Sequence, residues 1–219
     1  MYHYAQLSLA QTAAVRIQPA FLDEYAWGTV FPDIFRLAGV SRDATHLRKQ
    51  EMDDLLLRFP QQRSFMQGFR MHLLLDAIDL VKTIRSAFPV AQFRRFLANY
   101  LSSHFTPGAA ALLVEDIFTR RVSFKSLPAI SGKYNEAIAA LGFSEEVTDS
   151  YAQRVKAYLL QRSNKAPWHE SIDPDLHDPE RMQQDIAAYR QLKRNPLFFA
   201  MLLLGVKNAR LERAALEMI

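Results

Sequence analysis

Hydrophobic residues recur at spacings of three or four along most of the chain, which is the period of an amphipathic helix. Near the start, for example, Leu7, Ala10, Ala14 and Ile17 share one helical face. No stretch alternates apolar and polar residues over the length of a strand with enrichment in β-branched side chains. The pattern therefore predicts an all-α protein, built as a multi-helix bundle. Its helices are predicted over residues 5–16, 45–59, 65–88, 91–104, 107–119, 132–141, 144–160, 178–193 and 196–218.

The least helical part of the sequence is the segment 163–179, which holds three prolines and many polar residues. Prolines disfavour the interior of a helix, and a loop of this size in a compact domain is usually functional or mobile. We therefore predict a single helical domain over residues 1–219, in which a proline-rich loop at 163–179 precedes a C-terminal helical hairpin at 179–219.

The composition limits the chemistry of the protein more than its fold. The 219 residues include six histidines but no cysteine, which excludes disulfides, thiolate zinc sites, iron–sulfur clusters and cysteine nucleophiles. Any metal ion must therefore be held by histidines and carboxylates. The formal net charge of +4 suits an anionic substrate. Basic residues form short pairs such as Arg94-Arg95 rather than a sustained basic face, so the sequence carries no strong signal for nucleic-acid binding.

The longest apolar stretch runs from Pro196 to Val206 and is about half as long as a helix that crosses a membrane. We interpret it as a buried C-terminal helix, or alternatively as the surface through which the protein forms a homodimer. The first residues of the chain lack the basic segment of a signal peptide. The sequence therefore predicts a cytoplasmic protein without a transmembrane segment.

Three polar residues stand out because they lie in a leucine-rich segment. His72 and Asp76 are four residues apart, so in a helix their side chains point to the same side. Asp79 follows one turn later, which predicts a second carboxylate near that face. A carboxylate in an apolar helix needs a partner, usually a metal ion or a histidine. A plain hydrogen-bonded or exposed pair of histidine and aspartate is the alternative.

Another group of polar residues lies earlier in the chain. Asp33 follows Pro32 between hydrophobic residues, where a charge also needs a partner, and helix capping is its alternative role. His46 ends a loop that carries Arg42, and His3 precedes the first apolar helix. Each histidine by itself is explained equally well as a solvated side chain.

Taken in order, these residues resemble a known family, the zinc-dependent phospholipases C, which share their all-helical fold with the zinc-dependent single-strand nucleases. The pattern is a histidine before the first helix, then Gly-x-x-x-Pro-Asp-Ile, Arg-x-x-x-His, and a Gly-x-x-x-His-x-x-x-Asp helix. It covers about residues 1–90. The matching residues are His3, Gly28, Pro32, Asp33, Ile34, Arg42, His46, Gly68, His72 and Asp76.

The resemblance implies a zinc ion bound by Asp33, His46, His72 and Asp76. It also implies a second zinc ion, which His3 binds and Asp76 bridges to the first. Histidines and carboxylates suit zinc, and other divalent metals can use the same ligands. Metal ions in such enzymes activate a water and stabilise the charge that develops on a phosphoryl oxygen. The expected reactive group is thus the metal-bound water, with Asp33 as the candidate catalytic side chain.

Arg36, Arg42 and Arg70 lie near these motifs and are candidates for binding a phosphate, with solvated surface as the alternative. The expected function is a metal-dependent hydrolase similar to phospholipase C, acting on a phosphoester small molecule or a phospholipid headgroup. The chain departs from the family because it contains no His-x-x-x-Glu motif, so ligands of a third metal ion are missing. The alternative function is a non-enzymatic helical interaction protein that keeps a partial metal site.

Overall fold

The computed structural model describes residues 2–86, 105–164, 178–194, 196, 199–200, 203–204 and 211–217. These residues form helices joined by turns, and no strand occurs among them, which confirms the all-α prediction. The α-helices are α1 (His3–Ile17), α2 (Leu22–Val30), α3 (Lys49–Arg58), α4 (Arg63–Asp76), α5 (Leu80–Ser86), α7 (Pro107–Arg121), α8 (Glu136–Ala140), α9 (Glu145–Ser163), α11 (Pro179–Lys193) and α13 (Leu211–Glu217). The 3₁₀ helices are η1 (Phe31–Phe35), η2 (Arg42–Ala44), η3 (Pro60–Gln62) and η4 (Phe124–Ser126).

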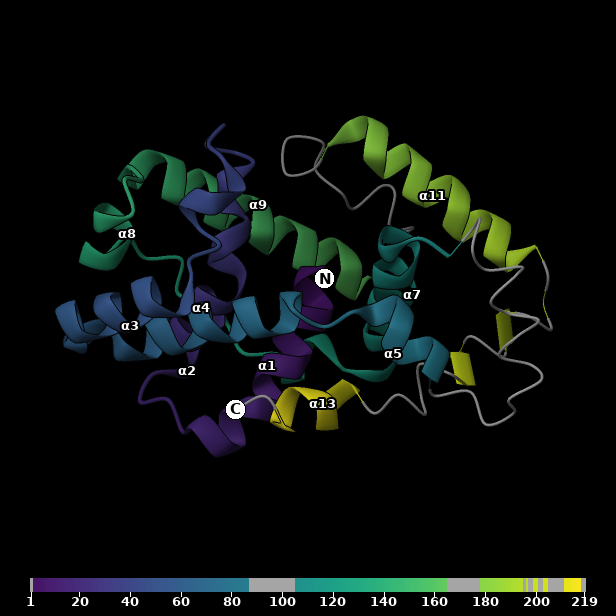
Figure 1. Ribbon diagram of the computed structural model, residues 1–219, viewed down its shortest axis with the longest axis horizontal. Helices are drawn as coiled ribbons and strands as arrows, with labels where there is room; N and C mark the ends of the chain where they lie inside the picture. Colours follow the sequence, from purple (N-terminus) through teal and green to yellow (C-terminus); the bar gives the residue numbers. More distant parts are fainter. Residues whose placement is uncertain are drawn as a thin grey trace.

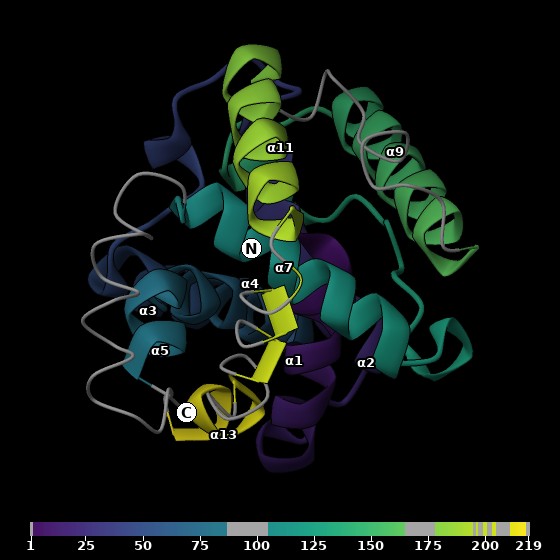
Figure 2. The ribbon, with the colours of Figure 1, turned by 90° about the vertical axis from the view of Figure 1, so that its right-hand side faces the viewer.

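Helix α1 lies among the other helices and contacts α2, α4, α7, α9 and α13 (Figure 1, Figure 2). Every residue from His3 to Ala10 is buried, including the polar side chains of Gln6 and Ser8. A helix that is buried on all sides is typical of the centre of a protein. This position explains why the histidine at the start of α1 lies inside the protein rather than in solvent.

Helices α2 and α4 pack against each other more closely than any other pair of described helices, and two glycines make this possible. A Cβ atom on Gly28 would overlap the backbone carbonyl of Phe65, and a Cβ atom on Gly68 would overlap the carbonyl of Tyr25. The contacts are reciprocal, so the backbone of each helix fits against the glycine of the other. The crossing fixes the ends of both helices relative to each other.

Several helix boundaries follow the capping signals in the sequence. The side chain of Ser144 accepts a hydrogen bond from the backbone N–H of Val147 at the start of α9. Pro107 occupies the first turn of α7, as predicted. Gly142 has a φ of 87° at the predicted stop before α9. These three positions confirm the predicted ends of the helices around them.

The single long helix predicted over residues 65–88 is wrong, because α4 ends at Asp76 and α5 begins at Leu80. The side chain of Asp79 accepts a hydrogen bond from the backbone N–H of Lys82 and so caps a new helix. Asp79 is exposed at this cap. It therefore serves the start of α5 rather than acting as a second carboxylate beside Asp76.

Two further helix starts differ from the prediction, and one observed helix is not predicted. Helix α3 begins later than residue 45, because the side chain of Glu51 accepts a hydrogen bond from the backbone N–H of Arg48. Helix α8 begins later than residue 132, because Asn135 caps it. Helix α2 is absent from the predicted set, since Gly28 lowers the helix propensity of its segment.

The C-terminal part of the chain contributes two of the helices. Helix α11 packs against α7, and α13 packs against α1. The predicted helix at 91–104, most of the loop at 163–179 and most of the apolar stretch at 196–206 lie outside the described residues. The C-terminal hairpin and the dimer surface therefore stay predictions. None of the helices described is both long enough and apolar enough to span a membrane.

The start of α1 is held by a carboxylate from another helix. Glu115 of α7 is buried, and its oxygens accept hydrogen bonds from the backbone N–H groups of Tyr4 and Ala5 and from the hydroxyl of Tyr158. The first N–H groups of a helix have no partner within it, and a negative charge there is favourable. Burial nevertheless raises the pKa of Glu115, although these hydrogen bonds and Arg162 act in the opposite direction.

We expect Gly28→Ala and Gly68→Ala each to lower the free energy of unfolding by about 3 kcal/mol, the upper end of the usual cost of overpacking. The added methyl group would meet a backbone carbonyl that cannot move aside. The control is Gly39→Ala, because Gly39 has a φ of 65° but open space around its Cβ position. Gly39→Ala should lower the free energy of unfolding by only about 1 kcal/mol, which is the cost of backbone strain alone. Urea unfolding measures all three, and equal losses at Gly68 and Gly39 would contradict the close crossing.

The stability of the protein should depend on pH through Glu115. A carboxyl with a raised pKa holds its proton more tightly in the fold, so its contribution is present at low pH and is lost as the pH rises above the ordinary pKa of 4.5. We therefore expect the stability difference between wild type and Glu115→Gln to shrink from about pH 4 toward neutrality. Urea unfolding at several pH values measures this difference. Glu146→Gln, at an exposed glutamate of α9, controls for the loss of a charge. A difference that grows with pH would contradict the raised pKa.

Candidate metal centre

Three segments that are distant in the sequence bring polar side chains together beside the α2–α4 crossing. Asp33 lies on η1, which directly follows α2, and His46 follows η2. His72 lies near the end of α4. One ligand atom from each of these three residues lies within 4.8 Å of the other two, so the group could hold a metal ion. Helix capping, the alternative role for Asp33, is not observed, because η1 has no side-chain cap.

The backbone anchors one of the two ring nitrogens of His72, which is fully buried. Its Nδ1 donates a hydrogen bond of 2.8 Å to the carbonyl of Thr29, which requires the proton to sit on Nδ1. In neutral His72, Nε2 therefore presents a lone pair. This Nε2 is buried and has no hydrogen-bond partner among the described residues. Such an atom raises the free energy of the fold unless a cation or a donor binds it.

His46 has a similar arrangement. Its Nδ1 lies 3.2 Å from the carbonyl oxygen of Arg42 and 3.1 Å from the hydroxyl oxygen of Thr45. The Thr45 hydroxyl itself donates to the carbonyl of Pro32, so both neighbours of Nδ1 are acceptors and Nδ1 carries the proton. The lone pair on Nε2 then faces Asp76, whose Oδ2 is 3.2 Å away. Two acceptors at this distance need a proton or a metal ion between them.

Asp76 joins the two histidines. Its Oδ2 lies 3.2 Å from Nε2 of His46 and 3.6 Å from Nε2 of His72. The same oxygen accepts a hydrogen bond of 2.7 Å from the guanidinium of Arg42. Burial alone would raise the pKa of Asp76, but the neighbouring imidazoles of His46 and His72 outweigh it and hold the pKa well below its ordinary value. Asp76 therefore stays ionised and adds a negative charge at the edge of the group.

The remaining charges of the site also shift one another's pKa. Burial would raise the pKa of Asp33, but His72 and His3 outweigh it, and the net pKa is lowered. Burial would lower the pKa of His72, but Asp33 and Asp76 outweigh it, and the net pKa is raised. The carboxylates thus draw a positive charge into the site. A proton on His72 and a metal ion compete for this place.

His3 reaches the group from the first turn of α1. Its Nδ1 lies 3.7 Å from Oδ2 of Asp33 and 3.1 Å from Oε1 of the buried Gln6. Its Nε2 lies 3.4 Å from the hydroxyl of Tyr151, which donates to the carbonyl of Val30. Burial lowers the pKa of His3. The ring is therefore buried beside Asp33, while its role as a ligand of a second ion remains a prediction.

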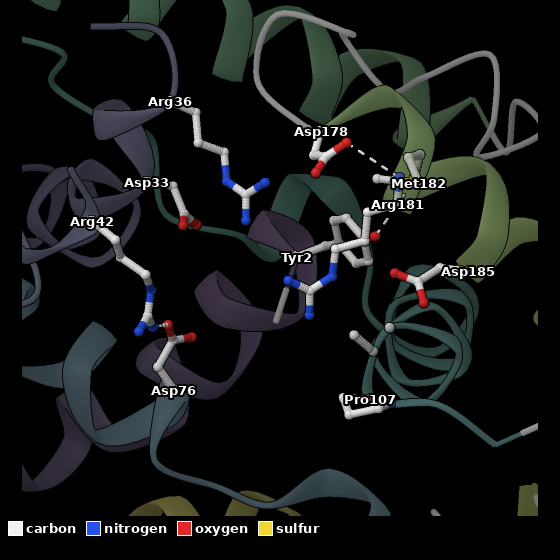
Figure 3. A pocket seen from close by; sticks show the side chains of 12 residues that line it. Tyr2, Asp33, Arg36, Arg42, Asp76, Pro107, Asp178, Arg181, Met182 and Asp185 are labelled. Carbon is white, nitrogen blue, oxygen red and sulfur yellow. Dashed lines mark hydrogen bonds and ion pairs between the residues drawn. The ribbon is translucent and has the colours of Figure 1, made fainter. Parts of the chain in front are cut away.

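The group borders a pocket with a volume of about 380 Å³ (Figure 3). The side chains of Asp33 and Asp76 are 21% and 17% exposed, so a small molecule in the pocket can reach them. Residues of α7 and α11 form the opposite wall. The lining residues are Tyr2, Asp33, Arg36, Arg42, Asp76, Pro107, Gly108, Ala111, Asp178, Arg181, Met182 and Asp185.

Two of the three arginines that are candidates for phosphate binding line this pocket. The side chain of Arg42 enters the pocket beside Asp76. The side chain of Arg36, the residue that directly follows η1, also enters the pocket (Figure 3). Arg70 is exposed on α4 and is not among the lining residues. Arg36 and Arg42 are therefore placed to contact a ligand in this pocket, whereas Arg70 is not.

Several residues that surround the site are not predicted from the sequence. Gln6 and Tyr151 are buried next to His3, yet a glutamine or a tyrosine at an apolar helix position gives no signal in a sequence. Arg181 lines the pocket but lies far along the chain. Glu115 does carry a signal, since it is a charge within an apolar run, as Asp33 is. That signal alone would have marked it as a buried carboxylate with partners.

The side chains at the site fit a divalent metal ion. Imidazole nitrogens and carboxylate oxygens are ligands that zinc and other divalent ions bind. His46 and His72 also make the outer hydrogen bonds from Nδ1 to backbone carbonyls that are typical of metal-binding histidines. The unpaired Nε2 of His72 is the atom that such an ion would satisfy.

Comparison of the chain with models of protein families, with characterised proteins and with solved structures finds no match. No family is therefore shown for this protein. The resemblance to zinc-dependent phospholipases C remains a prediction from the order of residues in the sequence.

Proposed function

We propose that this protein is a metal-dependent hydrolase of phosphoesters. The observation that carries the proposal is the buried Nε2 of His72, which has no hydrogen-bond donor in the described part of the chain and lies next to Asp33 and His46. Buried polar atoms are rarely left without a partner in a folded protein. A divalent metal ion would satisfy this nitrogen and balance the charge of the neighbouring carboxylates.

In this proposal Asp33, His46 and His72 hold the ion, with Asp76 as a further ligand. A bound ion supplies a water of lowered pKa and a positive charge opposite the phosphoryl oxygens. The carbonyls of Arg42 and Thr29 keep the two imidazole rings oriented through Nδ1. The carboxylate of Asp33 lines the pocket, where it is placed to accept a hydrogen bond from the attacking water.

The position of Arg42 is a reason to expect that the reacting group of the substrate is a phosphate. Its guanidinium contacts Asp76, and its side chain is 55% exposed and lines the pocket (Figure 3). Guanidinium groups bind phosphate oxygens through two parallel hydrogen bonds. Arg42 would therefore stabilise the negative charge that develops on a phosphoester beside the ion.

Zinc is the proposed metal, both for its preference for histidine and carboxylate ligands and for the resemblance to zinc-dependent phospholipases C. The proposal includes a second ion that is bound by His3 and bridged by Asp76. The distance of 3.7 Å between His3 and Asp33 supports a place for it beside the first. The proposed substrates are phosphoester small molecules, including phospholipid headgroups. A helical interaction protein would bind metal without hydrolysing any of them.

We expect the purified protein to contain a divalent metal in near-stoichiometric amount, as measured by elemental analysis. Asp33→Asn and His72→Ala should each weaken zinc binding by at least about tenfold, because each removes one ligand of the group. Asp54→Asn, at an exposed carboxylate of α3, is the matched control and should bind zinc like the wild type. Unchanged metal content in both Asp33→Asn and His72→Ala would contradict the site.

The metal-loaded protein should hydrolyse bis(p-nitrophenyl) phosphate, a general phosphodiester probe. We expect Arg42→Gln to lower kcat/KM by about 100-fold, since it removes a positive charge that faces the reacting phosphate. Arg70→Gln is the matched control, because Arg70 lies outside the pocket. Full metal occupancy without hydrolysis of phosphodiesters or phosphomonoesters would favour the interaction protein instead.

A further inference from the structure

The pocket extends beyond the metal group, which consists of Asp33, His46, His72 and Asp76. The far half of the pocket contains side chains that the proposed function does not use. Arg36 and Arg181 enter this half from opposite walls. Arg36 directly follows η1, and Arg181 lies in the first turn of α11. Figure 3 shows both side chains reaching into the space between the walls. Two positive groups therefore share one cavity.

Neither of these arginines has a carboxylate partner in the described part of the chain. Arg36 lies over the ring of Phe35, with 5.2 Å between its Cζ and the ring centroid, and a guanidinium that stacks on an aromatic ring can still donate hydrogen bonds through its N–H groups. Four aspartates also line the pocket, namely Asp33, Asp76, Asp178 and Asp185, and two guanidinium groups that share a cavity are further stabilised by an anion that lies between them. Ion pairs in the described residues are instead made by Arg42, Arg48, Arg120, Arg162 and Arg213.

The carboxylates of the α11 wall are already stabilised by other donors. Asp178 caps α11 and accepts hydrogen bonds from two backbone N–H groups of its first turn. Asp185 accepts a hydrogen bond from the hydroxyl of Thr106 and lies against Gly108, where a Cβ atom would overlap its carboxylate. Both carboxylates therefore lie at helix N-termini, where the helix dipole favours a negative charge. The hydrogen bonds that these two carboxylates accept come from Thr106 and from backbone N–H groups rather than from the guanidinium groups of Arg36 or Arg181.

We propose that Arg36 and Arg181 bind a second phosphate group of the substrate, which makes the substrate a small molecule with two phosphates. This proposal rests on the proposed function of the same pocket. Arg36 follows Asp33 by three residues at a 3₁₀ helix, so both lie on one side of the chain and the subsite adjoins the metal group. One phosphate lies at the metal group and the other between the guanidinium groups, whose geometry matches phosphate oxygens. A cavity of about 380 Å³ accommodates a ligand of this size.

Calorimetric titration with methylenediphosphonate, an analogue with two linked phosphonates that cannot be hydrolysed, tests the subsite. The titration uses chelator-treated protein, so that its result does not depend on a bound metal. We expect Arg36→Gln and Arg181→Gln each to weaken binding by about tenfold, as is usual for the loss of a hydrogen-bonding charged group. Arg36→Lys and Arg181→Lys should keep part of the affinity, because the charge remains. In the zinc-loaded protein, where the ion would hold the second phosphonate, methylphosphonate, which has one phosphonate, should bind at least about tenfold more weakly than the diphosphonate.

Arg190→Gln is the matched control, since Arg190 is exposed later on the same helix α11 and does not line the pocket. It should bind the diphosphonate like the wild type. Equal binding by the wild type, Arg36→Gln and Arg181→Gln would overturn the subsite, as would equal affinities of the zinc-loaded protein for the two phosphonates. Tighter arginine-dependent binding of a short single-stranded oligonucleotide would also overturn it, because the ligand would then be a nucleic acid.

Elemental analysis of the same variants separates this proposal from the proposed function. Metal content should be unchanged in Arg36→Gln and Arg181→Gln, because neither arginine belongs to the metal group. Binding of the diphosphonate through both arginines by a protein that takes up no metal would support the subsite and overturn the metal-dependent function. Normal metal content and normal hydrolysis, together with diphosphonate binding that neither arginine substitution weakens, would support the metal-dependent function and overturn the subsite.

Discussion

Two helix backbones can come into direct contact only where neither carries a side chain, and in this protein they do so at Gly28 and Gly68. Thr29 directly follows Gly28, and His72 lies one turn after Gly68 on the same face of α4. The crossing therefore brings the carbonyl of Thr29 to 2.8 Å from Nδ1 of His72. A side chain at either glycine would move this carbonyl away from the imidazole. The orientation of the His72 imidazole thus depends on the two glycines, because only residues without a side chain allow the helices to come this close.

Once the crossing has formed, hydrogen-bond acceptors outnumber donors on its pocket side. His46 and His72 each use Nδ1 for a backbone carbonyl, so both Nε2 atoms remain as acceptors beside Asp33 and Asp76. Arg42 supplies one positive charge at the edge, through Asp76. A cation among the four groups lowers the free energy of this arrangement, and either a proton or a metal ion could supply it.

The sequence predicts this centre because its residues are recognisable locally. A charge within an apolar run and a spacing of four between His72 and Asp76 are visible without a fold, and so are the caps of α7 and α9. The end of α4 is not visible in this way, because it depends on Asp79 capping the next helix instead of extending the periodic pattern. Arg181 is also unpredictable, since its place in the pocket depends on how α11 packs against α7. Local signals thus identify ligands, whereas the walls of the pocket follow from tertiary packing.

A comparison of Glu115 with Asp33 shows that burial alone does not mark a carboxylate as functional. Glu115 is surrounded by N–H and O–H donors, and burial raises its pKa. Asp33 lies next to His72 and His3, which lower its pKa, and one side of it is open to the pocket. The first arrangement is complete without a ligand, whereas the second is stabilised by any cation that enters from the pocket. The two are connected, because Glu115 fixes the start of α1, and the start of α1 carries the histidine that lies beside Asp33.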